Sequence, residues 1–260
     1  MQLPLPPGLG KMRRPFPYGS PMESSSSRKP LEPIRHDTLQ QRVYQRIRES
    51  LADGQFKPGE ILTIRDLARQ LGTSVMPVRE ALHKLTVEQI LDLTANRSVR
   101  VPTLTGEKFA EICDARMIIE GNLARLAAQR ANEADLALIE LANKDFGSAK
   151  VARDPTLLLQ KNREFHFAIY SAAHQPTLMG MIEPLWVRCG PCTLTLFEEM
   201  GPEQVKKSAA NPHKAALDAI RAKRPSEAQQ AIVADIRATS ERYQKHVTEA
   251  AGSERHAKPE

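Results

Sequence analysis

The chain has 260 residues, with 37 Lys and Arg against 31 Asp and Glu, a formal net charge of +6 at pH 7, and three cysteines. No run approaches the roughly 20 consecutive apolar residues that a membrane span needs, and the first residues lack the apolar core of a secretory signal. We therefore expect a cytoplasmic protein with no membrane partner and with reduced thiols. The excess of basic residues lies before residue 103, which predicts an N-terminal part that binds a polyanion and a neutral C-terminal part with another role.

Residues 1–33 contain many prolines, a run of four serines at 24–27 and no apolar periodicity, which predicts a disordered arm. Its five Lys and Arg residues could contact DNA phosphates, or the arm could be a solvated tail alone. We expect a second disordered tail at residues 251–260. Between these ends the length allows two domains, which we place at residues 34–102 and 103–250.

The N-terminal domain begins with an amphipathic helix and continues into a helix-turn-helix. Apolar residues repeat every four positions over residues 38–52, and an Asp-Gly pair ends that helix. Within residues 66–85, Gly72 stands where the end of a helix needs a residue that tolerates positive φ. Ser74 follows as the expected N-cap of the next helix. An ordinary helical hairpin within a core is the alternative interpretation of this stretch.

Two β-prone runs follow the helix-turn-helix, at residues 90–94 and 99–102, around a polar turn. This pattern predicts a β-hairpin. A helix-turn-helix followed by a hairpin is a winged helix, whose second helix would enter the major groove of DNA with its N-terminus first. The wing tip, Asn96-Arg97, would then lie near the minor groove or the backbone.

Residues 38–102 resemble the winged-helix domain of GntR-type bacterial transcriptional regulators, in the Pro-Gly turn, the LA..LG of the first helix and the PVREAL of the second. In that family the recognition helix starts Ser-Arg-Thr-Pro-Val-Arg. Here Val75 and Met76 replace its first arginine and its threonine, and Ser98 replaces the wing-tip glycine. The resemblance therefore implies DNA binding with fewer polar side chains at the base edges.

The resemblance also implies which side chains contact DNA. Arg79 could bind guanine bidentately, worth about 1–3 kcal/mol of discrimination, while Val75 and Met76 could contact thymine methyl groups or leave the motif with relaxed specificity. Arg100 would join the wing arginine in contacting the backbone. The expected DNA-binding set is Arg65, Ser74, Val75, Met76, Arg79 and Arg97.

Helix follows helix from Thr105 to the C-terminus, which predicts an antiparallel bundle and, for the whole chain, a mainly α fold with one small hairpin. Bundles of this kind hold ligands in their cores. The expected helix starts are Thr105, Asn132 or Glu133, Asp154-Pro155, Thr177 after the break at Pro176, Pro202 and Pro225.

This half is similar to the all-helical ligand-binding domain (FCD domain) of FadR-type GntR regulators. The similarity rests on Arg116-(x3)-Glu120, on NREFHFAIYSAAH, and on a histidine followed by AALDAI. In many relatives matching positions bind a divalent metal, which would be Zn²⁺, Mn²⁺ or Ni²⁺. Here Asn stands where Asp is usual and Asp where His is usual, so the alternative is a set of core polar residues bonded to one another. The implied ligands are Asn162, His166, His213 and Asp235.

Arg116 lies within the apolar stripe of the first bundle helix and must pair with something. The resemblance places it at the effector pocket, where a guanidinium suits a carboxylate bidentately. The alternative is a salt bridge to Glu120, one helical turn away.

A competing signal is Cys189-Gly190-Pro191-Cys192, which has the spacing of a thioredoxin-type redox pair. No βαβ pattern flanks it, although the low thiol pKa of such pairs depends on a helix N-terminus. A redox switch and a Gly-Pro kink between two buried thiols are the other interpretations.

We therefore predict a homodimeric regulator of the FadR subfamily, with repression as the expected mode. It would bind double-stranded operator DNA with an affinity controlled by a small carboxylate effector, through a divalent metal or without one. No catalytic constellation is visible, so we predict no enzyme. A thiol redox protein and a metal-dependent enzyme are the alternatives.

Overall fold

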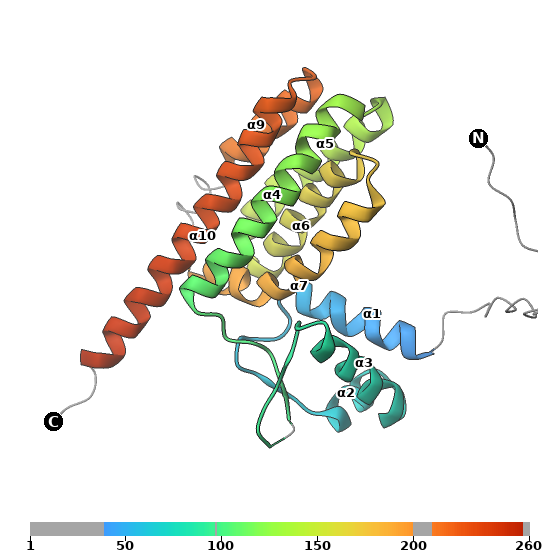
Figure 1. Ribbon diagram of the computed structural model, residues 1–260, viewed down its shortest axis with the longest axis vertical. Helices are drawn as coiled ribbons and strands as arrows, with labels where there is room; N and C mark the ends of the chain where they lie inside the picture. Colours follow the sequence, from blue (N-terminus) through green and yellow to red (C-terminus); the bar gives the residue numbers. More distant parts are fainter. Residues whose placement is uncertain (1–38, 97, 200–209, 257–260) are drawn as a thin grey trace, which may run out of the picture. The chain divides into compact units, whose positions relative to one another are not determined.

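The computed structural model describes residues 39–96, 98–199 and 210–256 (Figure 1). The described residues form helices and one small antiparallel sheet, so the predicted mainly α fold with a single hairpin-based sheet is confirmed. The expected N-terminal arm, the wing-tip residue Arg97 and the expected helix start at Pro202 lie outside the described residues.

Three short helices build the N-terminal part: α1 (Leu39–Ala52), α2 (Ile64–Gln70) and α3 (Val75–Val87). Gly72 links α2 to α3 with a φ of +60°, as expected for a turn that favours glycine. Ser74 occupies the N-cap position of α3, but within the described part its side chain makes no capping hydrogen bond. The core beneath these helices is formed by Val43, Ile47, Leu51, Leu67, Val78, Leu82 and Leu85.

The wing is a three-stranded antiparallel sheet of β1 (Ile61–Leu62), β2 (Asp92–Leu93) and β3 (Val99–Arg100), with β3 in the centre. The hairpin of β2 and β3 confirms the sequence prediction. Strand β1 was not predicted, because two residues are too few to show an alternating pattern. It pairs with β3 and so ties the segment before α2 to the wing.

The remaining helices form a bundle in which α4 and α10 lie side by side (Figure 1). Most starts agree with the sequence, because Thr105, Asn132 and Asp154 each cap a helix with a side-chain oxygen. The fourth bundle helix begins at Pro176 itself rather than at Thr177. The helices are α4 (Gly106–Arg130), α5 (Glu133–Ala152), α6 (Pro155–Ser171), α7 (Pro176–Glu199), α9 (Ala210–Arg221) and α10 (Pro225–His256).

The last helix corrects one expectation. Helix α10 continues to His256, six residues into the segment 251–260 that we expected to be a disordered tail. Ala, Glu and Arg at these positions favour a helix and outweigh the single glycine among them. None of the helices in the described ranges is long and apolar enough to cross a membrane.

Helix α7 contributes to both cores. Trp186 belongs to the bundle core, while the neighbouring Val187 packs in the cluster beneath α1 and α3. Two ion pairs join the same regions: Arg48 to Glu183 at 3.0 Å and Arg163 to Asp53 at 2.7 Å. The bundle and the helix-turn-helix are therefore in direct contact through α7 and the end of α1.

Candidate functional site

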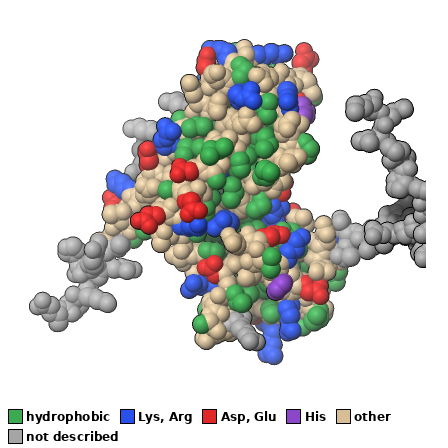
Figure 2. All heavy atoms as spheres, in the orientation of Figure 1, with side chains coloured by type: hydrophobic (Ala, Val, Ile, Leu, Met, Phe, Trp, Pro, Cys, Tyr) green, Lys and Arg blue, Asp and Glu red, His purple; other side chains and the backbone are tan. Residues whose placement is uncertain are grey.

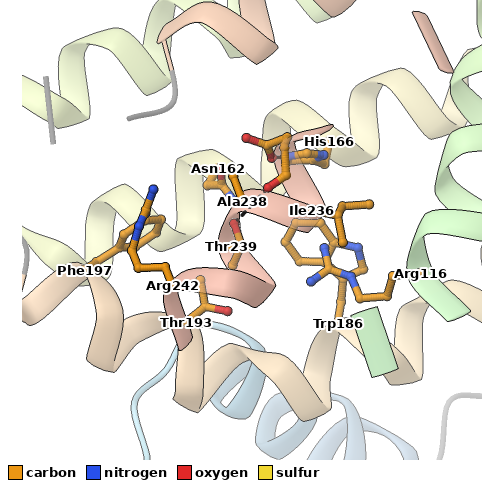
Figure 3. A pocket seen from close by; sticks show the side chains of 11 residues that line it. Arg116, Asn162, His166, Trp186, Thr193, Phe197, Ile236, Ala238, Thr239 and Arg242 are labelled. Carbon is orange, nitrogen blue, oxygen red and sulfur yellow. Dashed lines mark hydrogen bonds and ion pairs between the residues drawn. The ribbon is translucent and has the colours of Figure 1, made fainter. Parts of the chain in front are cut away.

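Three potential metal ligands meet inside the bundle, one each from α6, α9 and α10. They are His166, His213 and Asp235, and one ligand atom from each lies within 4.8 Å of the others. The Asp235 Oδ2 atom is 3.2 Å from Nε2 of His166 and 3.9 Å from Nε2 of His213. Asn162 lies one helical turn before His166 and lines a cavity together with His166 and Asp235 (Figure 3). All four sequence-predicted ligands therefore come to one place in the bundle.

His213 lies in a buried, aromatic environment. Its side chain is 1 % exposed, and neither ring nitrogen has a hydrogen-bond partner among the described residues. The ring stacks on Phe165, with centroids 4.1 Å apart. Burial lowers the pKa of His213 to about 3, so the ring is neutral at pH 7 and its lone pair is available.

Asp235 supplies the carboxylate of this group. Burial by itself would raise the pKa of Asp235, but a hydrogen bond with His166 and the neighbouring positive charges outweigh burial and lower the pKa to about 2. Two imidazoles, one carboxylate and the nearby Asn162 amide are a donor set that suits Zn²⁺, Mn²⁺ or Ni²⁺. The residues present therefore fit a divalent metal.

The sequence left two interpretations of Arg116, a salt bridge to Glu120 or a place at a ligand cavity. The structure shows both features. Its Nε donates to Glu120 Oε1 at 2.6 Å, and both side chains are buried. Its guanidinium also lies over the Trp186 ring, 4.2 Å from the centroid. Figure 3 shows Arg116, Trp186 and Arg242 around the same cavity as His166. The two guanidinium groups supply donors that suit a carboxylate, while Arg116 is already paired with Glu120 and Asp235 lines the same cavity.

Two residues that the sequence analysis did not single out complete this region. The Tyr170 hydroxyl lies 2.8 Å from His166 Nδ1 and donates to Glu120. Trp186 forms the wall on which Arg116 stacks. Tyr170 follows His166 by four residues, as His166 follows Asn162, so the spacing on α6 was an available signal. For Trp186, the single tryptophan of the chain, no comparable pattern existed.

The leading end of α3 is exposed, which the DNA-binding prediction requires. Val75 and Met76 have 41 % and 53 % of their surface exposed, and Arg79 is exposed on the next turn. Arg65 is exposed at the start of α2. Two adjacent apolar side chains at an exposed helix start are accessible to a binding partner.

The Cys-Gly-Pro-Cys stretch lies in the interior of α7, with both thiols buried. Helix α7, and not a strand, leads into it from Pro176, so the strand-to-helix setting of a thioredoxin pair is missing here. Gly190 has another role: a Cβ there would lie 2.7 Å from the carbonyl oxygens of Leu51 and Ala52. These contacts favour the interpretation that Gly190 allows α7 to cross close to α1, with the two thiols buried beside it, over the interpretation as a redox pair.

Comparisons with known proteins identify both the N-terminal part and the bundle. Residues 39–101 match the model of bacterial regulatory proteins of the gntR family, and residues 111–238 match the FCD domain. The chain is 33 % identical to the HTH-type transcriptional regulator McbR of Escherichia coli over 73 % of this chain and 86 % of that protein. It is 24 % identical to the galactonate operon transcriptional repressor of Escherichia coli, over 77 % and 94 % of the two chains.

A solved structure, E. coli McbR/YncC, superposes with a TM-score of 0.74 at 29 % sequence identity. The match covers 80 % of this chain and 99 % of that one. The similarity therefore extends over the winged helix and the bundle together.

Proposed function

Because the chain belongs to the GntR family of transcriptional regulators and carries an FCD domain, we propose that it is a homodimeric repressor controlled by a small organic acid. Members of the family are regulators of transcription rather than enzymes, and they bind operator DNA. The observation that carries the proposal is the buried group of His166, His213 and Asp235 inside a bundle that is joined to an exposed recognition helix. Repression is supported by relatives such as the galactonate operon repressor.

The DNA-binding surface of the proposal is the leading end of α3 with its flanks. Arg79 would bind a guanine, and Val75 and Met76 would contact thymine methyl groups in the major groove. Arg65 would contact phosphates and add to the salt dependence of binding. Ser74 and the wing residue Arg97 complete the proposed set.

The metal of the proposal would be held by Asn162, His166, His213 and Asp235. The two buried nitrogens of His213, which have no hydrogen-bond partner in the part of the chain that the structure describes, support it, since such groups destabilise a fold unless something satisfies them. A divalent ion at this place would offer coordination positions to an effector carboxylate. The bundle's own residues exclude bulk water and hold both imidazole rings in place.

The effector of the proposal is a small carboxylate that contacts Arg116 and Arg242 in the cavity. The cavity has a free volume of about 30 Å³, which holds a water molecule or two but not an organic acid. An acid would therefore displace lining side chains, one of which is Trp186. The next residue in α7, Val187, packs in the N-terminal core, so a movement of Trp186 would be transmitted to that core. Binding would thus favour one placement of the winged helix over another, as a change in operator affinity requires.

A homodimer would place two recognition helices on half-sites related by a two-fold axis. Figure 2 shows hydrophobic side chains gathered over the bundle. Ile118 on α4 and Met181 on α7 are 75 % and 55 % exposed, which makes them candidates for contacts with a second protomer. We place the DNA-binding domain at 34–102 and the effector and dimerisation domain at 103–250, supported by the two family matches. DNA binding in turn supports a cytoplasmic location.

The test is the metal content of the protein purified without a histidine tag, compared with the double variant His166→Ala plus His213→Ala. The matched control is His174→Ala, because His174 is 50 % exposed and pairs with Asp135 outside the cavity. We expect stoichiometric metal in the parent and the control and none in the double variant. A thermal-shift screen of carboxylic acids should then show stabilisation that depends on metal. Equal metal content in all three proteins would refute the metal site.

A further inference from the structure

We propose that Tyr170 and Glu120 are positioning residues that determine which ring nitrogen of His166 binds the metal. They keep the proton on Nδ1 and leave Nε2 as the ligand atom. The inference rests on the metal site proposed above and adds two residues that are not ligands themselves.

The position of each proton follows from the hydrogen bonds. Glu120 is fully buried and accepts from Arg116 Nε at Oε1 (2.6 Å) and from Tyr170 at Oε2, so both of its oxygens act as acceptors here. The Tyr170 hydroxyl has a single proton, and it donates that proton to Glu120 Oε2. Toward its other neighbour the Tyr170 oxygen can therefore only accept. His166 Nδ1, 2.8 Å away, must be the donor.

This arrangement determines the chemistry at the other side of the ring. With its proton on Nδ1, the neutral imidazole of His166 has its lone pair on Nε2. That atom lies 3.2 Å from Asp235 Oδ2, which is also an acceptor. Two acceptors at this distance need a cation or a further proton between them. Zinc–nitrogen and zinc–oxygen bonds of about 2.0–2.1 Å place two ligand atoms of one tetrahedral ion about 3.3 Å apart.

The chain of hydrogen bonds from Arg116 through Glu120 and Tyr170 to His166, called the relay below, is built from two pairs of residues with helical spacing. Arg116 and Glu120 are one turn apart on α4, and His166 and Tyr170 are one turn apart on α6. Glu120, Tyr170 and His166 are each no more than 1 % exposed. Water therefore cannot easily replace a missing partner, and a partner of this kind orients a ligating histidine and raises its basicity.

The test compares Tyr170→Phe with Tyr243→Phe in the full-length protein. Tyr243 is a matched control, because it is also buried and its hydroxyl donates to the Leu104 carbonyl at 3.0 Å, outside the relay. Affinity for Zn²⁺ is measured by competition with a chromogenic chelator, and thermal unfolding shows that each variant is folded. We expect Tyr170→Phe to bind Zn²⁺ about 10–100-fold more weakly and Tyr243→Phe to remain within about 2-fold of the parent. Glu120→Gln should weaken binding in the same direction.

A second measurement does not depend on metal. Long-range ¹H–¹⁵N correlations on the metal-free, histidine-labelled parent report which nitrogen of His166 carries the proton. We expect Nδ1 to carry a proton in the parent, with any further proton shared between Nε2 and Asp235, and Nδ1 to lose that preference in Tyr170→Phe. A proton found on Nε2 alone, or an unchanged Zn²⁺ affinity in Tyr170→Phe, overturns the inference and leaves the metal site standing. A parent protein that binds no metal at all removes both proposals.

Discussion

Replacing Gly190 tests the close contact between α7 and α1. Its effect on stability can be separated from the general effect of replacing a glycine inside a helix. In Gly190→Ala the new Cβ would lie 2.7 Å from the carbonyl oxygens of Leu51 and Ala52. The two backbones would have to move apart by about 0.7 Å to reach ordinary van der Waals contact. Overpacking of this kind destabilises a fold by about 1–3 kcal/mol.

The same substitution also gives a gain, because alanine is favoured over glycine inside a helix by up to about 1 kcal/mol. Gly180→Ala measures that gain by itself. Gly180 lies in the same helix α7, is exposed, and its added Cβ would meet no atom of the described residues within 4 Å. Subtracting one variant from the other therefore isolates the packing of α7 against α1.

The assay is urea unfolding of the parent and both variants, followed by circular dichroism and by tryptophan fluorescence, since the single Trp186 lies in α7. We expect Gly180→Ala to be at least as stable as the parent, and Gly190→Ala to be less stable than Gly180→Ala by about 1–3 kcal/mol. If the two variants unfold at the same urea concentration with the same slope, the close crossing of α1 and α7 does not exist in solution. The glycine of the Cys-Gly-Pro-Cys stretch would then need another explanation.

Three further predictions test other parts of the molecule. Arg79→Ala should lose about 1–3 kcal/mol of discrimination at one operator base pair, measured by fluorescence anisotropy with single-base operator variants. The Arg69 side chain pairs with Asp66 on the surface, so Arg69→Ala should leave that discrimination unchanged. Arg116→Met should lower the free energy of unfolding by about 3–5 kcal/mol, because Glu120 would remain buried without its ion-pair partner Arg116. A loss below about 1 kcal/mol in chemical denaturation would contradict a buried ion pair. Ile118→Arg should convert the proposed dimer to a folded monomer in light scattering after size exclusion, and an unchanged mass would place the interface elsewhere.

The parts of the fold that the sequence predicted are those set by local chemistry. Thr105, Asn132 and Asp154 mark helix starts because a side-chain oxygen next to an apolar stripe is sufficient to cap a helix. The short strand β1 was missed because its pairing partner is nearly forty residues away. The continuation of α10 was missed because no turn signal was available to separate a frayed tail from a helix.

The candidate site was predictable only as far as motif spacing extends. The pair Asn162 and His166 lies on one face by simple helical geometry, and His213 and Asp235 came from the resemblance to a family. The roles of Tyr170 and Trp186 depend on α4 packing against α6 and α7, and of the two only Tyr170 had a signal in the sequence, its helical spacing from His166. For the same reason the two interpretations of Arg116 could not be separated, and the structure shows a residue that serves in an ion pair and lines the cavity.

The exposed Val75 and Met76 at the start of α3 add contacts with base methyl groups to the hydrogen bonds proposed for Arg79. Thymine and 5-methylcytosine carry the same C5 methyl group into the major groove, while uracil and cytosine do not. A repressor that recognises its site in this way would lose affinity for an operator made with uracil, and would tolerate a methylated cytosine where an unmethylated one is rejected. Base modification by a DNA methyltransferase would then be a second input to operator binding, beside the effector proposed above.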